Sequence, residues 1–415
     1  MGYNVVMEKK ILTLAIVGGG AAGLTLACAL SKQLNTIAVF ERGERVGRKL
    51  SATGNGQGNI TNVRAKEERY FSCSAKGALR AKDAIQVFDE THLTTFYREK
   101  GVLLLPDLRG RVYPASKQAS SLTDALRFTL SSRQIPVYTN TQIVRLEKER
   151  GIFRLTAQTP DGEKIFYAEN VALCTGGKAA KNFGTDGTAY ALAQSFGHTL
   201  TPLYPSLVQC KTDTKDIKTL KGIRIADGVL TAQMATEKVR VQGDILFTDY
   251  GVSGDATFRL SAFFAHELEA SEVTLGIDFL PSLEEQTIYK TLQEKATAYP
   301  DLPTGELLFG IVNNQVGRAV MRRAGGDLKR AAALLKNFTL RVNGTLGFDY
   351  AQVTKGGIPL EETDENLQSR KVSGLYFAGE ILDVDGQCGG FNLQWAYASA
   401  QTVAAAILQK TRGQV

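Results

Sequence analysis

A glycine-rich turn near the N-terminus constrains this chain more than any other feature. Residues 18–23 read G-G-G-A-A-G, which fits the pattern G-x-G-x-x-G. Residues 11–17 before the turn are apolar and predict a buried strand, and residues 21–32 after it predict a helix. In this setting glycines let the backbone approach a pyrophosphate, which the N–H groups at the helix start can bind. The pattern predicts a dinucleotide site that includes Gly18, Gly20, Ala21, Ala22 and Gly23.

The same stretch also has features of a signal peptide or a short membrane helix. A basic start precedes an uncharged run from residue 11 to residue 30. The glycines in the middle of that run would each cost a helix about 1 kcal/mol, which argues against both alternatives. We therefore expect no targeting segment and no membrane attachment, and we expect residues 1–10 to form a loose tail.

The segments after the turn favour FAD among the dinucleotides. Residues 36–40 predict a second strand that ends at Glu41, whose carboxylate can bond ribose hydroxyls, with Arg42 beside it. Residues 47–62 are so rich in Gly, Asn, Ser and Thr that no regular element is expected there. A plain NAD dehydrogenase would begin its second helix sooner, so this long polar loop indicates FAD. Its candidate contacts to phosphate, ribityl hydroxyls and the flavin edge are Arg48, Lys49, Ser51, Thr53, Gly54 and Asn59.

The polar loop resembles the signature G-R-K-x-x-x-[ST]-G-x-G-x-x-N-x-T-N of a bacterial and archaeal flavoprotein family. Its members are labelled aminoacetone oxidase-like or NAD(FAD)-utilizing dehydrogenases, and a bile-acid-pathway flavin reductase is related to them. Further blocks agree with the family at residues 110–116, 173–177, 197–208, 374–386 and 389–396. The resemblance spans residues 11–408, and one departure is Gln57-Gly58, where most members have Arg-Cys.

Three more segments are expected to hold the flavin. Residues 171–173 predict a strand that leads into Thr175, Gly176 and Gly177, and residues 375–378 predict one that delivers Gly379 and Glu380 to the sheet end. By resemblance, a helix over residues 391–408 points its N–H groups at the flavin pyrimidine edge, where they favour negative charge on reduced flavin. Also by resemblance, strand 141–146 pairs with the adenine. The remaining expected contacts are Ile143, Val144, Asp385, Gly389, Gly390, Phe391 and Asn392.

The resemblance implies an α/β fold, with a three-layer FAD/NAD(P)-binding Rossmann-like domain and an inserted β-barrel plus small helical subdomain. The implied division is a flexible tail at 1–10, the first part of the FAD domain at 11–199, the insert at 200–346, and the second part of the FAD domain at 347–415.

Inside the insert, strands are predicted at 229–234, 238–242 and 244–248, and helices at 284–296 and 304–323. Arg318, Arg322 and Arg323 are expected to share one solvated helix face. Asp186 is expected to cap the helix that follows it, with a direct site role as the alternative. Tyr113, with the hairpin at 107–110, is a candidate to line the substrate pocket.

Composition excludes several function classes. Five scattered cysteines without a C-x-x-C pair indicate a reducing, cytoplasmic compartment, and three separated histidines predict no metal site. The formal net charge is +7, but the chain has no run of five like charges, which disfavours nucleic acid as a partner. The oligomeric state is not predicted.

The sequence thus predicts an FAD-dependent oxidoreductase that passes hydride between a small organic substrate and flavin N5. One version is an oxidase of an aminoacetone-type amine with O₂ as acceptor. The alternative is a reductase of an activated C=C bond, with NAD(P)H as a transient electron donor. An RNA-modifying or non-catalytic flavin-binding protein remains open as another class. No catalytic residue is identified.

Overall fold

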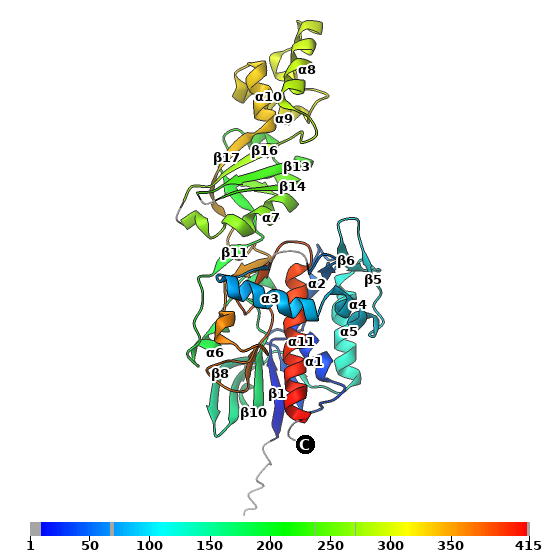
Figure 1. Cartoon of the computed structure of the whole chain (residues 1–415), viewed down its shortest axis with the longest axis vertical. Coiled ribbons are helices and arrows are strands. Elements are labelled where there is room, and N and C mark those ends of the chain that lie inside the picture. The colour runs from blue at the N-terminus through cyan, green and yellow to red at the C-terminus, as the bar shows by residue number, and fades with distance from the viewer. Residues whose placement is uncertain (1–9, 67–69, 236, 270, 413–415) are drawn as a thin grey trace, which may run out of the picture. The chain divides into compact units, whose positions relative to one another are not determined.

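The computed structural model describes residues 10–66, 70–235, 237–269 and 271–412 (Figure 1). Of the predicted tail, only Lys10 is among them, and the rest lies outside the described residues. The chain forms two compact units. The first, here called the sheet unit, contains the residues up to 203 and those from 353 onward, and the second, the barrel unit, contains residues 204–352.

A seven-stranded sheet forms the centre of the sheet unit. The strand β1 (Ile11–Val17) pairs in parallel with β2 (Ile37–Phe40) and β10 (Gly162–Leu173). All four residues of β2 are buried, as expected for a parallel strand covered on both faces. The parallel part is completed by β7 (Val137–Tyr138) and β19 (Leu375–Phe377), and β9 (Ile152–Thr159) and β8 (Gln142–Glu149) add an antiparallel ribbon.

Two helices from opposite ends of the chain pack together beside this sheet, namely α1 (Ala21–Leu30) and α11 (Phe391–Arg412) (Figure 1). The indole Nε1 of Trp395 on α11 donates to the carbonyl oxygen of Gly379 at 3.1 Å, which ties the helix to the loop after β19. The other helices of the unit are α2 (Arg48–Ser51), α3 (Ala75–Val87), α4 (Glu90–Arg98), α5 (Ala119–Ser132) and α6 (Tyr190–Gln194).

Short strands outside the main sheet complete this unit. A three-stranded sheet has the order β3 (Thr61–Asn62), β6 (Arg111–Pro114) and β5 (Leu104–Pro106). A second small sheet pairs β20 (Asp385–Gly386) with β4 (Tyr70–Phe71), and β18 (Val353–Lys355) lies just before a pair of glycines. The prediction of an irregular segment at 47–62 is therefore wrong at both ends, since α2 and β3 lie within it.

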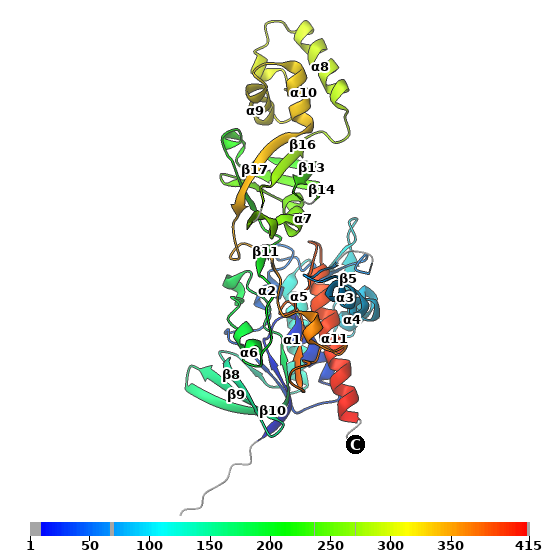
Figure 2. The same cartoon turned by 60° about the vertical axis from the view of Figure 1, so that its left-hand side comes forward.

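The barrel unit contains a closed six-stranded barrel with its own apolar core. In barrel order the strands are β12 (Cys210–Thr212), β15 (Gly251–Ser253), β14 (Lys238–Phe247), β13 (Arg224–Gln233), β16 (Thr274–Asp278) and β17 (Phe338–Thr345). The other elements of this unit are β11 (Tyr204–Ser206), α7 (Asp255–Phe264), α8 (Glu285–Ala298), α9 (Asn314–Ala324) and α10 (Leu328–Lys336) (Figure 2). The α/β fold with a barrel is confirmed.

Several predictions inside the barrel unit need correction. The segments 238–242 and 244–248 form one strand, β14, because Gly243 stays in register opposite Gly228. The predicted helix at 304–323 exists only as α9, preceded by one turn at Thr304–Glu306. Gly310 adopts a φ of +74°, which a helix cannot continue through, and the Asn313 side chain then caps the new helix by accepting from Gln315 N.

The three arginines of α9 do not share one solvated face. Arg318 and Arg322 are exposed, but Arg323 is half-buried, with its guanidinium 4.5 Å from the centroid of the Phe338 ring. A helix advances 100° per residue, so Arg323 is turned away from Arg322 toward the barrel.

Candidate functional site

The turn between β1 and α1 has the geometry that a phosphate-binding turn needs. Gly18 has a φ of +106°, and a Cβ there would lie 2.4 Å from the carbonyl oxygen of Cys174 on the neighbouring strand. A Cβ on Gly23 would lie 1.9 Å from the carbonyl oxygen of Gly18, so helix and strand approach as closely as glycine allows. Gly20, by contrast, opens onto free space, since no described atom comes within 4 Å of where its Cβ would stand.

At the end of β2, the Glu41 carboxylate holds two backbone segments in place, the glycine turn after β1 and the loop after β2. One carboxylate oxygen accepts from Gly19 N at 2.9 Å, and the other accepts from Gly43 N at 2.7 Å. Next to it, Arg42 Nη1 pairs with Asp186 at 2.9 Å, and Arg42 Nε donates to the carbonyl oxygen of Gly184. The sequence predicts that Glu41 and Arg42 take part in the site, and folding brings Asp186, 144 residues away, beside Arg42.

Asp186 does not cap α6, so that prediction is wrong. The residue before the helix is Ala189, which offers no side-chain cap. Asp186 instead binds Arg42 and accepts from Thr188 N at 3.0 Å. Burial works to raise the pKa of Asp186, but the hydrogen bonds from Arg42 and Thr188 outweigh it, and the pKa falls below its usual value.

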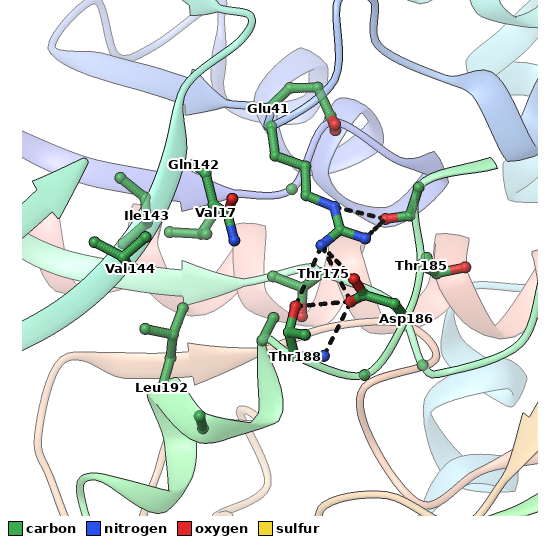
Figure 3. Close-up of a pocket in the computed structure, with 17 residues that line it drawn as sticks. Val17, Glu41, Gln142, Ile143, Val144, Thr175, Thr185, Asp186, Thr188 and Leu192 are labelled. Atoms are coloured by element: carbon green, nitrogen blue, oxygen red, sulfur yellow. Dashed lines mark hydrogen bonds and ion pairs between the residues drawn. The ribbon is translucent and has the colours of Figure 1, made fainter. Parts of the chain in front are cut away.

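A cavity of about 180 Å³ lies beside Glu41 and Asp186 within the sheet unit. Ile143, Val144 and Leu192 lie together on one side of it, and Asp186 and Thr188 on the other (Figure 3). Ile143 and Val144 sit on β8, as the adenine-pairing prediction requires. One apolar wall facing one polar wall suits a flat heterocycle joined to a ribose. Sequence reasoning missed the α6 side of this cavity, because Ala189 and Leu192 look like ordinary helix residues.

The polar loop presents its cations to protein groups. Lys49 Nζ pairs with Glu380 at 2.7 Å, and Arg48 Nη2 donates to the carbonyl oxygen of Asn182 at 2.7 Å. The other predicted contacts of the loop also face protein groups. The Ser51 hydroxyl shares a hydrogen bond with the Thr123 hydroxyl, and the Thr53 hydroxyl donates to the carbonyl oxygen of Leu50. The Asn59 amide donates to the carbonyl oxygens of Thr61 and Val112, and Gly54 packs against Asn59. Lys49 and Glu380 are 331 residues apart in sequence, so their ion pair joins two predicted site segments.

The second glycine turn lies against the same segment. A Cβ on Gly177 would stand 2.5 Å from the Thr354 hydroxyl and 3.0 Å from Glu380 Oε1. Gly176 has a φ of +74°. The hydroxyl of Thr175 is buried, and within the described residues it has no hydrogen-bond partner. A buried hydroxyl without a partner is expensive, and it is expected where a ligand completes the site.

The start of α11 is built from two glycines in a backbone conformation that residues with a Cβ rarely adopt. Gly389 and Gly390 have φ values of +125° and +101°, and a Cβ on Gly390 would lie 2.3 Å from the carbonyl oxygen of Thr61. The Asn392 side chain accepts from Gly386 N and donates to Gly386 O, both at 2.8 Å. These contacts fix the free N–H groups of the first helical turn close to β3 and β20.

A buried charged cluster lies beside this helix start, and it joins the predicted contact Asp385 to Lys355, which sequence reasoning missed. Lys355 Nζ lies 3.5 Å from Asp385, and their side chains are 12% and 0% exposed. Asp383 is 1% exposed, and burial raises its pKa even though Cys73 N and the Ser72 hydroxyl donate to it. The sequence signal that could have drawn attention to Lys355 is the glycine pair that follows it. In the structure Gly356 and Gly357 both have positive φ.

These features fit a bound dinucleotide. The first turn of α1 has no side-chain cap among the described residues, open space lies beside Gly20, and the Thr175 hydroxyl is unsatisfied. A helix start of this kind can bind an anionic ligand such as a pyrophosphate through its free N–H groups.

Comparison with known proteins identifies the family. Residues 12–406 match the family model described as the HI0933-like protein Rossmann domain. The chain belongs to the HI0933-like family. It is 33% identical over 403 residues to a 3-dehydro-bile acid delta(4,6)-reductase of Clostridium scindens, with 93% of this chain and 96% of the relative covered. It is 27% identical to a ribosomal RNA dihydrouridine synthase of Haemophilus influenzae, with 94% and 97% covered.

A solved structure supports the fold. The structure of a 3-ketosteroid-delta4-(5alpha)-dehydrogenase from Rhodococcus jostii in complex with 4-androstene-3,17-dione aligns with a TM-score of 0.51 at 15% identity, covering 98% of this chain and 99% of that one. The prediction of an FAD-dependent oxidoreductase from this flavoprotein family is confirmed, and FAD is its cofactor.

Two features are absent from the part of the chain that the structure describes. None of their helices has the length and apolar character needed to cross a membrane. No group of three or more His, Cys, Asp or Glu side chains in that part of the chain is arranged to hold a metal ion.

Proposed function

We propose that this protein is an FAD-dependent reductase of a C=C bond that is conjugated with a carbonyl group. The observation that carries the proposal is that two relatives, each matching at least 93% of this chain, have names that describe this same chemistry. The delta(4,6)-reductase acts on unsaturation conjugated with the 3-oxo group of a bile acid. A dihydrouridine synthase saturates the C=C bond next to a carbonyl in a pyrimidine. The aminoacetone oxidase version has no such support.

The structure suggests where each part of FAD would bind, and these assignments are part of the proposal. The adenosine would occupy the cavity beside Glu41, Ile143 and Val144, and the pyrophosphate would meet the start of α1. Thr175, Glu380 and Lys49 would lie along the ribityl chain. The sheet unit and the barrel unit would then be the cofactor domain and the insert that the sequence predicts.

When bound, FAD would supply the hydride for reduction of the C=C bond, and the proton that completes the reduction would come from water. The chain contributes position and charge. The free N–H groups at the start of α11, held by Gly389, Gly390 and Asn392, favour negative charge on the pyrimidine edge of reduced flavin. NAD(P)H would act as the transient electron donor.

The test follows the absorbance of oxidised flavin in the FAD-loaded protein under anaerobic conditions. We expect NADH or NADPH to bleach it, and a 3-oxo-Δ4 steroid or 2-cyclohexenone to restore it without air. Aminoacetone should not bleach it. Bleaching by aminoacetone, with recovery only when air is admitted, would refute the proposal.

Reduction of uracil in RNA is a second candidate, favoured by the relative named ribosomal RNA dihydrouridine synthase. Acidic and basic residues nearly balance in the barrel unit, so the positive charge of the chain lies in the sheet unit. If RNA is the substrate, its affinity should fall steeply with salt, as expected when phosphate contacts release counterions.

A further inference from the structure

The three-stranded sheet of β3, β6 and β5 has one face that is buried at its inner end, where Asn62 and Tyr113 are 2% and 7% exposed, and open at its outer end. Its register places Asn62 opposite Arg111 and Leu105 opposite Tyr113, and residues paired across antiparallel strands share one face. Arg111 and Tyr113 are two residues apart, so all four side chains lie on the same face. Leu103, two residues before Leu105, continues it. Leu105 and Leu103 are 47% and 60% exposed, which is unusual for two neighbouring leucines on one face.

A cation lies over the middle of this face. Lys117 Nζ lies 4.1 Å from the centroid of the Tyr113 ring. The backbone of Lys117 has a φ of +53°, a conformation that residues other than glycine rarely adopt. No carboxylate in the described part of the chain pairs with Lys117, whereas Arg111 is paired with Asp107 at 2.7 Å. The face therefore combines exposed apolar surface with one ammonium group that has no counter-charge.

The same face runs directly to the start of α11. Asn62 Nδ2 donates to the carbonyl oxygen of Gly389 at 3.2 Å. Asn62 Nδ2 and Arg111 Cγ lie 3.6 and 3.9 Å from the position that a Cβ on Gly389 would take. The face thus begins at the proposed pyrimidine edge of the flavin and ends at Leu105 and Leu103, at the edge of the β5–β6 hairpin labelled in Figure 1.

We propose that this face is the substrate platform, and that it binds an apolar molecule carrying one anionic group. The apolar body would cover Leu105 and Leu103, and a carboxylate or sulfonate would pair with Lys117. Burial of the leucines supplies affinity, and the single ammonium fixes the orientation of the ligand. The assignment as substrate platform rests on the proposed function, but the binding of an apolar anion to this face does not.

The experiment uses two fluorescent probes on the FAD-loaded protein. One is 1-anilinonaphthalene-8-sulfonate, and the other is its uncharged relative N-phenyl-1-naphthylamine. We expect Lys117→Gln to raise the dissociation constant of the sulfonate about tenfold, which corresponds to about 1.4 kcal/mol, and to leave that of the neutral probe unchanged. Leu105→Ser should weaken both probes.

The matched controls are Lys82→Gln and Leu79→Ser on α3, where Leu79 is 59% exposed. They should change neither dissociation constant, and the flavin spectrum of each variant shows whether it is folded and loaded. Equal weakening of both probes by Lys117→Gln, or the same effect from the controls, would overturn the proposal. So would displacement of the sulfonate by oligouridylate but not by decanoate, which would point to RNA.

The two proposals can fail separately. If the probes respond as expected but no enone is reduced, the proposed function is wrong and an anion site remains on this face. If an enone is reduced while Lys117→Gln leaves sulfonate binding unchanged, the function stands and the platform is wrong.

Discussion

Glu41 illustrates how a single carboxylate prepares a ligand site. Its two oxygens accept from Gly19 N and Gly43 N, so the backbone on both sides of the β2 end is held in place. A ribose that bonds to this carboxylate would find it already oriented, and little entropy would be lost on binding.

We expect Glu41→Ala to lower FAD affinity by roughly 10- to 100-fold, since hydrogen bonds to a charged group contribute about 1.5–3 kcal/mol. Fluorescence titration of the apoprotein with FAD measures this. The neighbouring exposed residue provides the control, Glu44→Ala, which should bind FAD normally. Equal losses in the two variants would mean that Glu41 has no specific contact with the cofactor.

Glu362 gives a prediction about acid stability. Burial works to raise its pKa, but hydrogen bonds from Lys371, Thr199 and His198 outweigh it and lower the pKa to about 2 from an ordinary 4.5. A lowered carboxyl pKa adds stability that is fully present above pH 4.5 and is lost as the pH falls toward 2. The shift corresponds to at most about 3 kcal/mol at neutral pH, since solvent screens part of the interaction.

Denaturant unfolding between pH 3 and pH 7 tests this. Glu362→Gln should lower the free energy of unfolding at pH 7 by at most about 3 kcal/mol and flatten its decline below about pH 4.5. Glu365→Gln, at an exposed position of the same loop, should leave the profile as it is. A steep acid decline that survives in Glu362→Gln would assign the acid sensitivity to other groups.

At the scale of the element, α11 depends on the backbone that precedes it. Gly390 has a φ of +101°, and a Cβ added to it would lie 2.3 Å from the carbonyl oxygen of Thr61. Gly101 has a φ of +81°, but nothing in the described structure lies within 4 Å of its Cβ position. Substituting alanine at Gly390 and at Gly101 therefore separates the cost of the backbone conformation from the cost of the steric contact with Thr61.

We expect Gly101→Ala to cost about 1–2 kcal/mol of stability through its left-handed backbone alone. Gly390→Ala should cost more and should also lower the FAD content, because Thr61 or the start of α11 must shift. Thermal unfolding of the apoprotein and the flavin content of the purified variants measure these effects. Similar losses for both variants would show that the contact with Thr61 is unimportant.

The elements that the sequence predicts well are those whose pattern is local. The apolar run at 11–17 and the glycines after it specify β1 and its turn almost residue by residue. The role of Asp186 could not be predicted in this way, because its partner Arg42 is 144 residues away in sequence. Lys355 was missed for the same reason, since only folding brings it beside Asp385 in a buried pair.

At the scale of the whole molecule, the described residues form two separate apolar cores, one in each unit. The proposed adenosine and pyrophosphate contacts all come from the sheet unit. A ligand that binds only one folded unit stabilises that unit by RT ln(1 + [L]/Kd), or about 2.7 kcal/mol at 100 times Kd.

Scanning calorimetry of the apoprotein should therefore resolve two transitions, and excess FAD should move only one of them to higher temperature. A fragment of residues 204–352 should unfold at the transition that FAD leaves unchanged. A single transition that moves as a whole with FAD would show that the two units unfold as one cooperative body.

The sheet itself is interrupted in sequence, since β10 ends at Leu173 and its parallel neighbour β19 begins at Leu375. On the ribosome, the turn that is proposed to receive the pyrophosphate is made first, and β19 and α11 are made last. At about 5–20 residues per second, the ~200 residues between β10 and β19 take on the order of 10–40 s to synthesise. During that time the end of β10 lacks its neighbour β19. The nascent chain therefore cannot complete the proposed cofactor site until the residues from 353 onward, about the last seventh of the chain, have been made.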